Sequence, residues 1–209
     1  MEAPITVVLV AITTLISLMA FQRYQVFEEL LFRPYAVQHR GEWYRLFTHA
    51  FIHADWGHLI VNMFVLFMFG GDVEYLYSVV SDLPVVVTYP VLYVGGILFA
   101  TLPGMAKQRD NSGYRSVGAS GAVSAVLFAQ IMLLPLEGID MLFVEDIPAW
   151  VFGILYLVYS YAMDKRGRDN VAHDAHFYGA VFGLLFSAAL YPKALSNIVE
   201  LIRSVFAWA

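Results

Sequence analysis

Long apolar stretches alternate with short polar segments along the whole chain of 209 residues. The stretches 5–21 and 85–102 contain no charged residue at all. About 20 apolar residues are needed for a helix to cross a hydrocarbon core about 30 Å thick, so stretches of this length are typical of transmembrane helices. We therefore expect an all-α, polytopic membrane protein. The pattern predicts six spans, at residues 4–21, 57–77, 84–102, 118–134, 148–163 and 174–191.

Two further segments have the pattern of helices that lie in the membrane interface. The long first loop, residues 22–56, mixes aromatic and charged side chains, as amphipathic interfacial segments do. Near the C-terminus, apolar residues recur with helical spacing at Ile198, Leu201, Ile202, Val205 and Phe206. The sequence thus predicts one six-helix membrane domain, residues 1–193, followed by an interfacial amphipathic helix, residues 194–209.

Composition excludes several other classes of protein. Hydrophobic residues make up 60% of the chain and charged residues 14%, against about 25% charged in soluble domains. The net charge of −5 comes with no basic patch, which excludes a nucleic-acid binder. The chain has no cysteine and hence neither disulfides nor thiolate metal sites. Its opening residues, MEAP, lack the positive charge of a signal peptide, so the first span is interpreted as a retained membrane helix.

A few polar side chains lie inside or at the ends of the predicted spans, where they are costly. His58 and Asn62, four residues apart, share one face of the second span. Ser120 begins the fourth span and His176 lies near the start of the sixth. Taken singly, each has an ordinary explanation: a serine packs between helices, a histidine lies at the interface, and an Asn–His pair bonds two helices together.

Spacing brings these residues together. Small residues recur every fourth position on the fourth and sixth spans, at Gly121, Ala125, Ala129, Ala175, Gly179 and Gly183. Such faces allow two helices to approach closely, so the two spans are expected to pack against each other. Both spans run in the same direction, which places Ser120 and His176 at one depth, as a nucleophile and its general base require. The second span also runs in this direction, so His58 and Asn62 at its start lie on the same side of the membrane, where they could stabilise an oxyanion.

Several motifs, in order, carry a family resemblance over residues 41–183. They are Trp43-Tyr44-Arg45, His53, the pair His58 and Asn62, Gly70-Gly71 with Glu74, Gly118-Ala119-Ser120-Gly121, and Ala175-His176 with Gly179 and Gly183. In this combination the chain resembles the rhomboid intramembrane serine proteases. The resemblance implies a Ser120–His176 dyad, with an oxyanion held by the side chains of His58 and Asn62 and by the backbone N–H of Ser120.

The resemblance also implies the substrate and its path. The substrate would be a single-pass transmembrane protein in the lipid bilayer, entering laterally past a gate on the fifth span made of Phe152, Tyr156 and Tyr159. Room for the substrate backbone would come from Gly118 and Gly121, and the first loop would be braced by Tyr44, Arg45 and Glu74. The expected location is the plasma membrane of a bacterium or archaeon. No metal or organic cofactor is implied, and the oligomeric state stays open.

Two positions near the dyad bear on how the His176 imidazole is oriented. Asp174 precedes His176 by two residues, about 200° around a helix, and is therefore not expected to orient that imidazole. Many rhomboids carry an aromatic residue four positions after the serine, where it packs on the base. This chain has Ser124 at that position, which leaves Tyr178 and Phe128 as alternative partners for His176.

Charge and family resemblance disagree on orientation. The first, third and fifth loops hold ten of the twelve Lys and Arg residues, which by the positive-inside rule places them and the dyad in the cytoplasm. The resemblance implies the reverse for typical bacterial members, and we adopt the family's orientation as the expectation.

Two other functions fit parts of the pattern. A catalytically inactive rhomboid-like protein would bind membrane clients, but such proteins usually lack the serine or the histidine. A proton or metal transporter would use the cluster of His49, His53 and His58, although no acidic path accompanies these residues through the spans.

Overall fold

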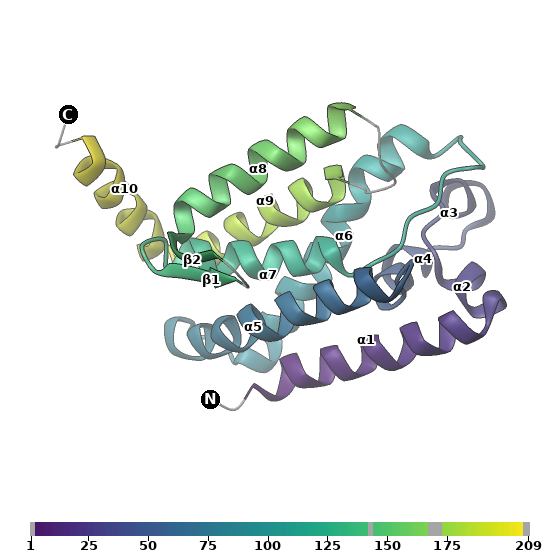
Figure 1. Ribbon diagram of the computed structural model, residues 1–209, viewed down its shortest axis with the longest axis horizontal. Helices are drawn as coiled ribbons and strands as arrows, with labels where there is room; N and C mark the ends of the chain where they lie inside the picture. The colour runs from purple at the N-terminus through teal and green to yellow at the C-terminus, as the bar shows by residue number, and fades with distance from the viewer. Residues whose placement is uncertain (1–2, 142–143, 167–172, 207–209) are drawn as a thin grey trace.

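The computed structural model describes residues 3–141, 144–166 and 173–206, and these residues form a helical bundle (Figure 1). The long helices are α1 (Pro4–Gln22), α5 (Trp56–Val80), α6 (Val85–Gln108), α7 (Ser120–Leu133), α8 (Ala149–Arg166), α9 (His173–Leu190) and α10 (Lys193–Phe206). The first loop contains short helices α2 (Tyr24–Leu30), α3 (Pro34–Arg40), α4 (Arg45–Thr48) and the 3-10 turn η1 (His49–Phe51). Each predicted span coincides with one of the long helices.

Three of these helices, α1, α5 and α6, are long and apolar enough to cross a membrane. The helices α7 and α8 carry apolar segments that are shorter. The chain is therefore a multi-pass membrane protein, whereas six crossings remain a prediction.

α7 lies at the centre of the bundle, where it packs against α5, α6 and α9 (Figure 1). Its sequence suits this position, because it is built from small and apolar residues and every residue from Gly121 to Leu133 is buried. The outer helices have fewer neighbours: α1 packs mainly on α5, and α8 mainly on α9. α8 is thus the helix of the candidate site that is held least firmly by the rest of the bundle.

The two ends of the bundle differ (Figure 1). The short helices of the first loop gather at the end where α5, α7 and α9 begin. At the other end lie α10 and a hairpin of β1 (Gly138–Met141) and β2 (Val144–Pro148), which pair antiparallel. This short hairpin is an exception to the all-α expectation, which agrees with the predominantly helical structure. Its strands are too short for alternation to reveal them, and the hairpin is anchored by the buried Ile139 and by backbone bonds that join Glu137 to Ala149 and Pro135 to Trp150.

The ends of two predicted elements also differ from expectation. We expected the third span to stop at residue 102, before Pro103, but α6 continues to Gln108 with Pro90 and Pro103 inside it. A helix formed at the predicted C-terminal position, since α10 covers Lys193–Phe206; residues 207–209 of the predicted element lie outside the described residues.

Glu74 has a different role from the one expected. Its buried carboxylate accepts hydrogen bonds from the backbone N–H groups of Ile5 (3.0 Å) and Thr6 (2.9 Å) and from the Thr6 hydroxyl. The single hydroxyl proton of Thr6 is used in the bond to Glu74, so Thr6 Oγ1 accepts the hydrogen bond of the Tyr89 hydroxyl at 3.0 Å. Glu74 therefore caps the start of α1 and ties it to α5, at the opposite end of α5 from the first loop. Its assignment as a brace of the first loop is replaced by this one, since the first N–H groups of a helix need an acceptor.

Candidate active site

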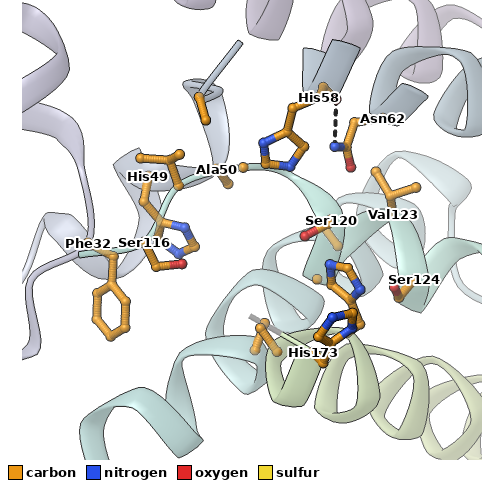
Figure 2. A pocket seen from close by; sticks show the side chains of 18 of the residues that line it. Phe32, His49, Ala50, His58, Asn62, Ser116, Ser120, Val123, Ser124 and His173 are labelled. Atoms are coloured by element: carbon orange, nitrogen blue, oxygen red, sulfur yellow. Dashed lines mark hydrogen bonds between the residues drawn. The ribbon is translucent and has the colours of Figure 1, made fainter. Parts of the chain in front are cut away.

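A cavity of about 920 Å³ lies where α5, α7 and α9 begin, and it contains the predicted dyad and oxyanion residues. Ser120, His176, His58 and Asn62 all line it. Figure 2 shows Ser120 between His58 and Asn62 on one side and His173 on the other. Four polar residues that are separated by up to 118 positions in the chain thus converge on one space inside an apolar bundle.

Ser120 is the first residue of α7, a position that exposes backbone N–H groups to the cavity. No side chain caps this helix, and the first intrahelical bond is donated by Val123 to Ala119. Uncapped N–H groups and the helix dipole together make a helix start favourable for a negative charge. The place where the serine side chain lies is therefore also suited to an oxyanion.

Gly118 sets the direction of the backbone that leads into α7. Its φ of +116° is rarely adopted by residues with a side chain, and its N–H donates to the carbonyl of His49. A Cβ at this position would lie 2.6 Å from Cε1 of His58. The space beside Gly118 is thus filled by the His58 ring in this structure, whereas the sequence suggested that it serves the substrate.

Glycines allow α7 and α9 to touch through their backbones. A Cβ at Gly179 would overlap the carbonyl oxygen of Gly121, and a Cβ at Gly183 would overlap that of Ala125. Small residues at helical spacing are what such close crossings require. Gly179 and Gly183 do not line the cavity, and their effect on it is to bring α9, and His176 with it, against α7.

His58 and Asn62 are held by the first turns of α5. Asp55 caps the helix, accepting the N–H of His58 at 2.8 Å. The buried Asn62 amide donates one N–H to the carbonyl of His58 at 2.9 Å, as the dashed line in Figure 2 shows. An amide nitrogen carries two N–H groups. One donor of Asn62 is thus used to fix the side chain, and a second is left for a ligand in the cavity.

His53 connects the segment before Ser120 to α1. Its Nε2 accepts the N–H of Ala119 at 3.3 Å, so its Nδ1 carries the proton and donates to Ser17 Oγ at 2.9 Å. The Ser17 hydroxyl donates to the carbonyl of Phe51. Ser17 was not among the residues predicted from the sequence. The available signal was the spacing of Thr6, Thr13 and Ser17, which share one face of a mostly apolar helix and are all buried in the structure.

Two histidines of the first loop are kept neutral by burial. Burial lowers the pKa of His53 to about 3, with a further decrease caused by the nearby His58. Burial also lowers the pKa of His49 to about 4. Neutral imidazoles can accept a hydrogen bond on one nitrogen, which the contact between His53 and Ala119 needs.

Tyr156 of α8 is the aromatic residue that packs on His176. The two rings are nearly parallel, with centroids 6.4 Å apart and an interplanar angle of 26°. Neither of the two alternatives from the sequence takes this position: the half-exposed Tyr178 contacts Phe177, and Phe128 packs on Tyr156 instead.

The environment of the dyad includes two more polar residues. His173 is buried edge-on against His176 at 5.9 Å and against Tyr159 at 5.7 Å. Asp174 accepts the N–H of Ala175 and pairs with Lys107, so its carboxylate is directed away from the imidazole. Ser120 and His176 themselves, both within the described residues, make no hydrogen bond with each other in this structure. Such a distance does not exclude a catalytic pair, because catalytic hydrogen bonds are often long before substrate binds.

The remaining predicted residues divide between the cavity wall and the first loop. Phe152, Tyr156 and Tyr159 line the cavity from α8. Arg45 is buried in the loop, where it donates to the carbonyls of Glu28 (3.0 Å) and Leu31 (2.8 Å) and pairs with Glu42. Tyr44 is half-exposed, and its ring lies under the Arg45 guanidinium. Among the described residues, no group of three or more His, Asp or Glu side chains has the geometry to hold a metal ion.

Comparison with known proteins agrees with this architecture. The family model described as Rhomboid domain matches residues 40–193. The chain is 32% identical over 151 residues to RHOMBOID-like protein 12, mitochondrial, of Arabidopsis thaliana, covering 67% of this chain and 44% of that protein. It is 27% identical over 180 residues to Rhomboid-related protein 1 of Caenorhabditis elegans, covering 82% and 47%. It is 30% identical over 156 residues to Rhomboid protease GluP of Bacillus subtilis (strain 168), covering 74% and 28%.

Fold and site thus define a multi-pass helical membrane protein with a polar cavity at one end of its bundle. The chain belongs to the rhomboid family, because the family model matches well over half of its residues. It spans less than half the length of each of these three relatives.

Proposed function

We propose that this protein is an intramembrane serine endopeptidase that uses Ser120 and His176 as its catalytic dyad. The observation that carries the proposal is the convergence of Ser120, His176, His58 and Asn62 on one cavity of an apolar bundle. Polar side chains are costly at such a depth, and their convergence on a space large enough for a peptide segment favours chemistry over packing. Membership of a family that includes a rhomboid protease supports the same reaction class.

In the acylation step, Ser120 Oγ attacks the scissile carbonyl carbon while His176 takes the hydroxyl proton. The carbonyl oxygen becomes an oxyanion, which accepts hydrogen bonds from the side chains of His58 and Asn62 and from the N–H of Ser120 at the start of α7. When the intermediate collapses, the C–N bond breaks and His176 delivers its proton to the leaving amine. The products of this step are the amine fragment and an acyl-enzyme on Ser120.

Deacylation repeats these roles with water. His176 removes a proton from a water molecule, which attacks the ester carbonyl, and the same donors stabilise the second oxyanion. His176 then returns the proton to Ser120 as the ester bond breaks, and the carboxylate fragment leaves. One water is consumed for each peptide bond hydrolysed, and no metal or cofactor takes part.

We further propose that the substrates are single-pass transmembrane proteins that enter from the bilayer beside α8. The loose packing of α8 against the rest of the bundle supports this path, as do the three aromatic residues that α8 presents to the cavity. Six crossings, the plasma membrane of a prokaryote and the outward orientation of the site stay predictions. The names of two relatives place them in mitochondria and chloroplasts.

A fluorophosphonate probe tests the proposed reaction on the purified protein in detergent. We expect covalent labelling of the wild type at Ser120, because a serine that is deprotonated by a neighbouring base attacks phosphorus as it attacks a carbonyl. Ser120→Ala should abolish labelling, and His176→Ala should lower its rate about 100-fold or more, the contribution typical of a general base. Mass spectrometry of the labelled peptide identifies the residue.

Ser187→Ala provides a matched control, since Ser187 is buried on α9 and bonded to Tyr77 away from the cavity. Its loss should leave labelling unchanged. A wild type that binds a transmembrane peptide but is never labelled would instead establish the catalytically inactive, client-binding rhomboid-like protein. The transporter hypothesis has weaker support, since His53 is committed to Ser17 and Ala119.

A further inference from the structure

The base of the dyad is covered by a side chain from α8, outside the two helices that carry the dyad. We propose that Tyr156 is a positioning residue for His176, that Ser124 holds it in place, and that movement of α8 therefore changes the orientation of the base. This inference rests on the proposed function, and it assigns to the fifth predicted span a role beyond that of a gate.

The ring of Tyr156 is fixed on several sides. Its hydroxyl makes a 2.6 Å hydrogen bond with Ser124 Oγ on α7. Phe128 packs against the ring at 5.4 Å and Phe152 at 6.2 Å. The ring then lies nearly parallel to the imidazole of His176. A ring held in this way restricts the rotation of its neighbour, because the imidazole cannot turn far without losing its contact with the fixed aromatic surface.

Ser124 is the reason that an α8 residue can reach this position. It lies one helical turn after Ser120 and is only 3% exposed. A serine leaves space on the His176 side of α7, and its hydroxyl supplies the partner that a buried tyrosine O–H needs. An aromatic side chain at position 124 would compete with Tyr156 for the same space. Ser124 and Tyr156 therefore act as one unit that spans two helices.

This arrangement couples entry of a substrate to the state of the base. α8 packs mainly on α9, and it contacts both imidazoles there: Tyr156 faces His176, and Tyr159 faces His173. A lateral displacement of α8 that admits a peptide would break the bond between Ser124 and Tyr156 and withdraw the ring from His176. Return of α8 would restore both contacts, so the base is fully oriented only when α8 has closed on the bound segment.

Labelling kinetics with the fluorophosphonate probe separate positioning from gating. We expect Tyr156→Leu to lower the maximal labelling rate constant by about two- to tenfold, the equivalent of one aromatic pair, at an unchanged half-saturating probe concentration. Tyr156→Phe keeps the ring and should recover most of that rate. The matched control is Tyr178→Leu, two residues from His176 on the exposed side of α9, which should be neutral. A residue that served only as a gate would give an unchanged or higher maximal rate in Tyr156→Leu.

A relocated ring provides the second test. Ser124→Tyr alone should lower the rate, because two rings then compete for one space. Combined with Tyr156→Ala, the same substitution places an aromatic ring on α7 in the vacated space and should restore labelling above that of Tyr156→Ala alone. If the fold-decrease in labelling rate of the double variant equals the product of the fold-decreases of the two single variants, the proposal is overturned, because residues that act independently give additive free energies.

The failure of this inference and that of the proposed function can be told apart by a measurement without turnover. In a Ser120→Ala background, NMR signals of the His176 ring protons should shift on Tyr156→Leu, since the aromatic ring current is lost, and not on Tyr178→Leu. If the wild type is not labelled but this shift is observed, the proposed protease function is rejected and the stacking of Tyr156 on His176 is retained. Ser120-dependent labelling with no shift and no rate change in Tyr156→Leu would reject the positioning role alone.

Discussion

Gly118 illustrates how much of the site depends on a single residue without a side chain. It has a left-handed φ, donates its N–H to His49 and leaves room for the His58 ring. Each of these features belongs to the backbone that leads into Ser120. The glycine therefore sets both the direction of the chain before α7 and the position of His58, one of the proposed oxyanion donors.

Gly118→Ala should consequently impair both stability and catalysis. We expect a loss of about 1–3 kcal/mol in the free energy of unfolding from the strained backbone. We also expect slower fluorophosphonate labelling of the protein that remains folded, because the new Cβ displaces His58. Thermal unfolding in detergent and labelling rates normalised to folded protein measure the two effects.

Gly41→Ala is the control for this prediction, because Gly41 also has a left-handed φ (+70°) but no atom lies within 4 Å of its hypothetical Cβ. Its substitution should cost stability and leave the labelling rate of the folded protein unchanged. Equal rates in the two variants would mean that His58 does not need the space beside Gly118.

At the level of single residues, the sequence identified which polar side chains would meet but not how they are held. Ser120, His176, His58 and Asn62 were predictable, because a polar group at depth in an apolar span has few uses. The stacking of Tyr156 on His176 was not, because it depends on the rotation of α8 about its own axis, which apolar periodicity does not specify in a helix that faces lipid. Ser17 was missed for a related reason, since its partner His53 lies in an irregular loop.

Among the helices, the contact between α7 and α9 controls the distance between Ser120 and His176, the proposed nucleophile and base. The backbones of these helices touch at Gly121 with Gly179 and at Ala125 with Gly183. His176 precedes Gly179 by one helical turn, so a displacement of the helices at this crossing is transmitted to the imidazole. Interfaces of this kind respond to a single added methyl group because protein interiors are close-packed.

Gly179→Ala should therefore separate α9 from α7 at the level of the dyad. We expect a destabilisation of about 1–3 kcal/mol from overpacking, and a decrease in labelling rate that exceeds the decrease in folded fraction. Gly71→Ala is the control on another helix, since its Cβ would make an ordinary 3.4 Å contact with Ala3. Unchanged labelling in Gly179→Ala would show that the dyad tolerates a wider helix crossing.

The positions of the helices were well predicted, because a hydrocarbon core about 30 Å thick constrains the length and composition of the helices that cross it, and α1, α5 and α6 meet that constraint. The exceptions are elements for which that constraint is weak. The hairpin of β1 and β2 lies in a connection between helices, and α6 passes through Pro103 because its neighbours hold it on both sides, with Ala100, Thr101, Pro103 and Gly104 all buried.

On the scale of the whole molecule, the first loop acts as part of the folded core. Arg45 ties α4 to the carbonyls of α2, His53 ties the loop to α1 and to the start of α7, and Phe32 pairs with Ser116 of the third loop. His49 is packed inside this assembly against Phe32. Unfolding of the protein therefore exposes His49 to water. The free energy of unfolding consequently depends on the protonation of this residue.

The sign of the resulting pH dependence follows from the pKa of His49, which is about 4 in the folded protein and 6.5 as the ordinary value. Between these values the unfolded chain binds a proton that the folded protein does not, so stability rises with pH in this window and falls on acidification. The full loss of free energy of unfolding is on the order of 3 kcal/mol for a shift of this size.

We expect the midpoint of thermal unfolding in detergent to decrease as the pH is lowered from 6.5 towards 4. His49→Phe should flatten this decrease while leaving the midpoint near pH 7.5 little changed. A variant with the same acid sensitivity as the wild type would place the proton uptake elsewhere, with His53 as the next position to replace.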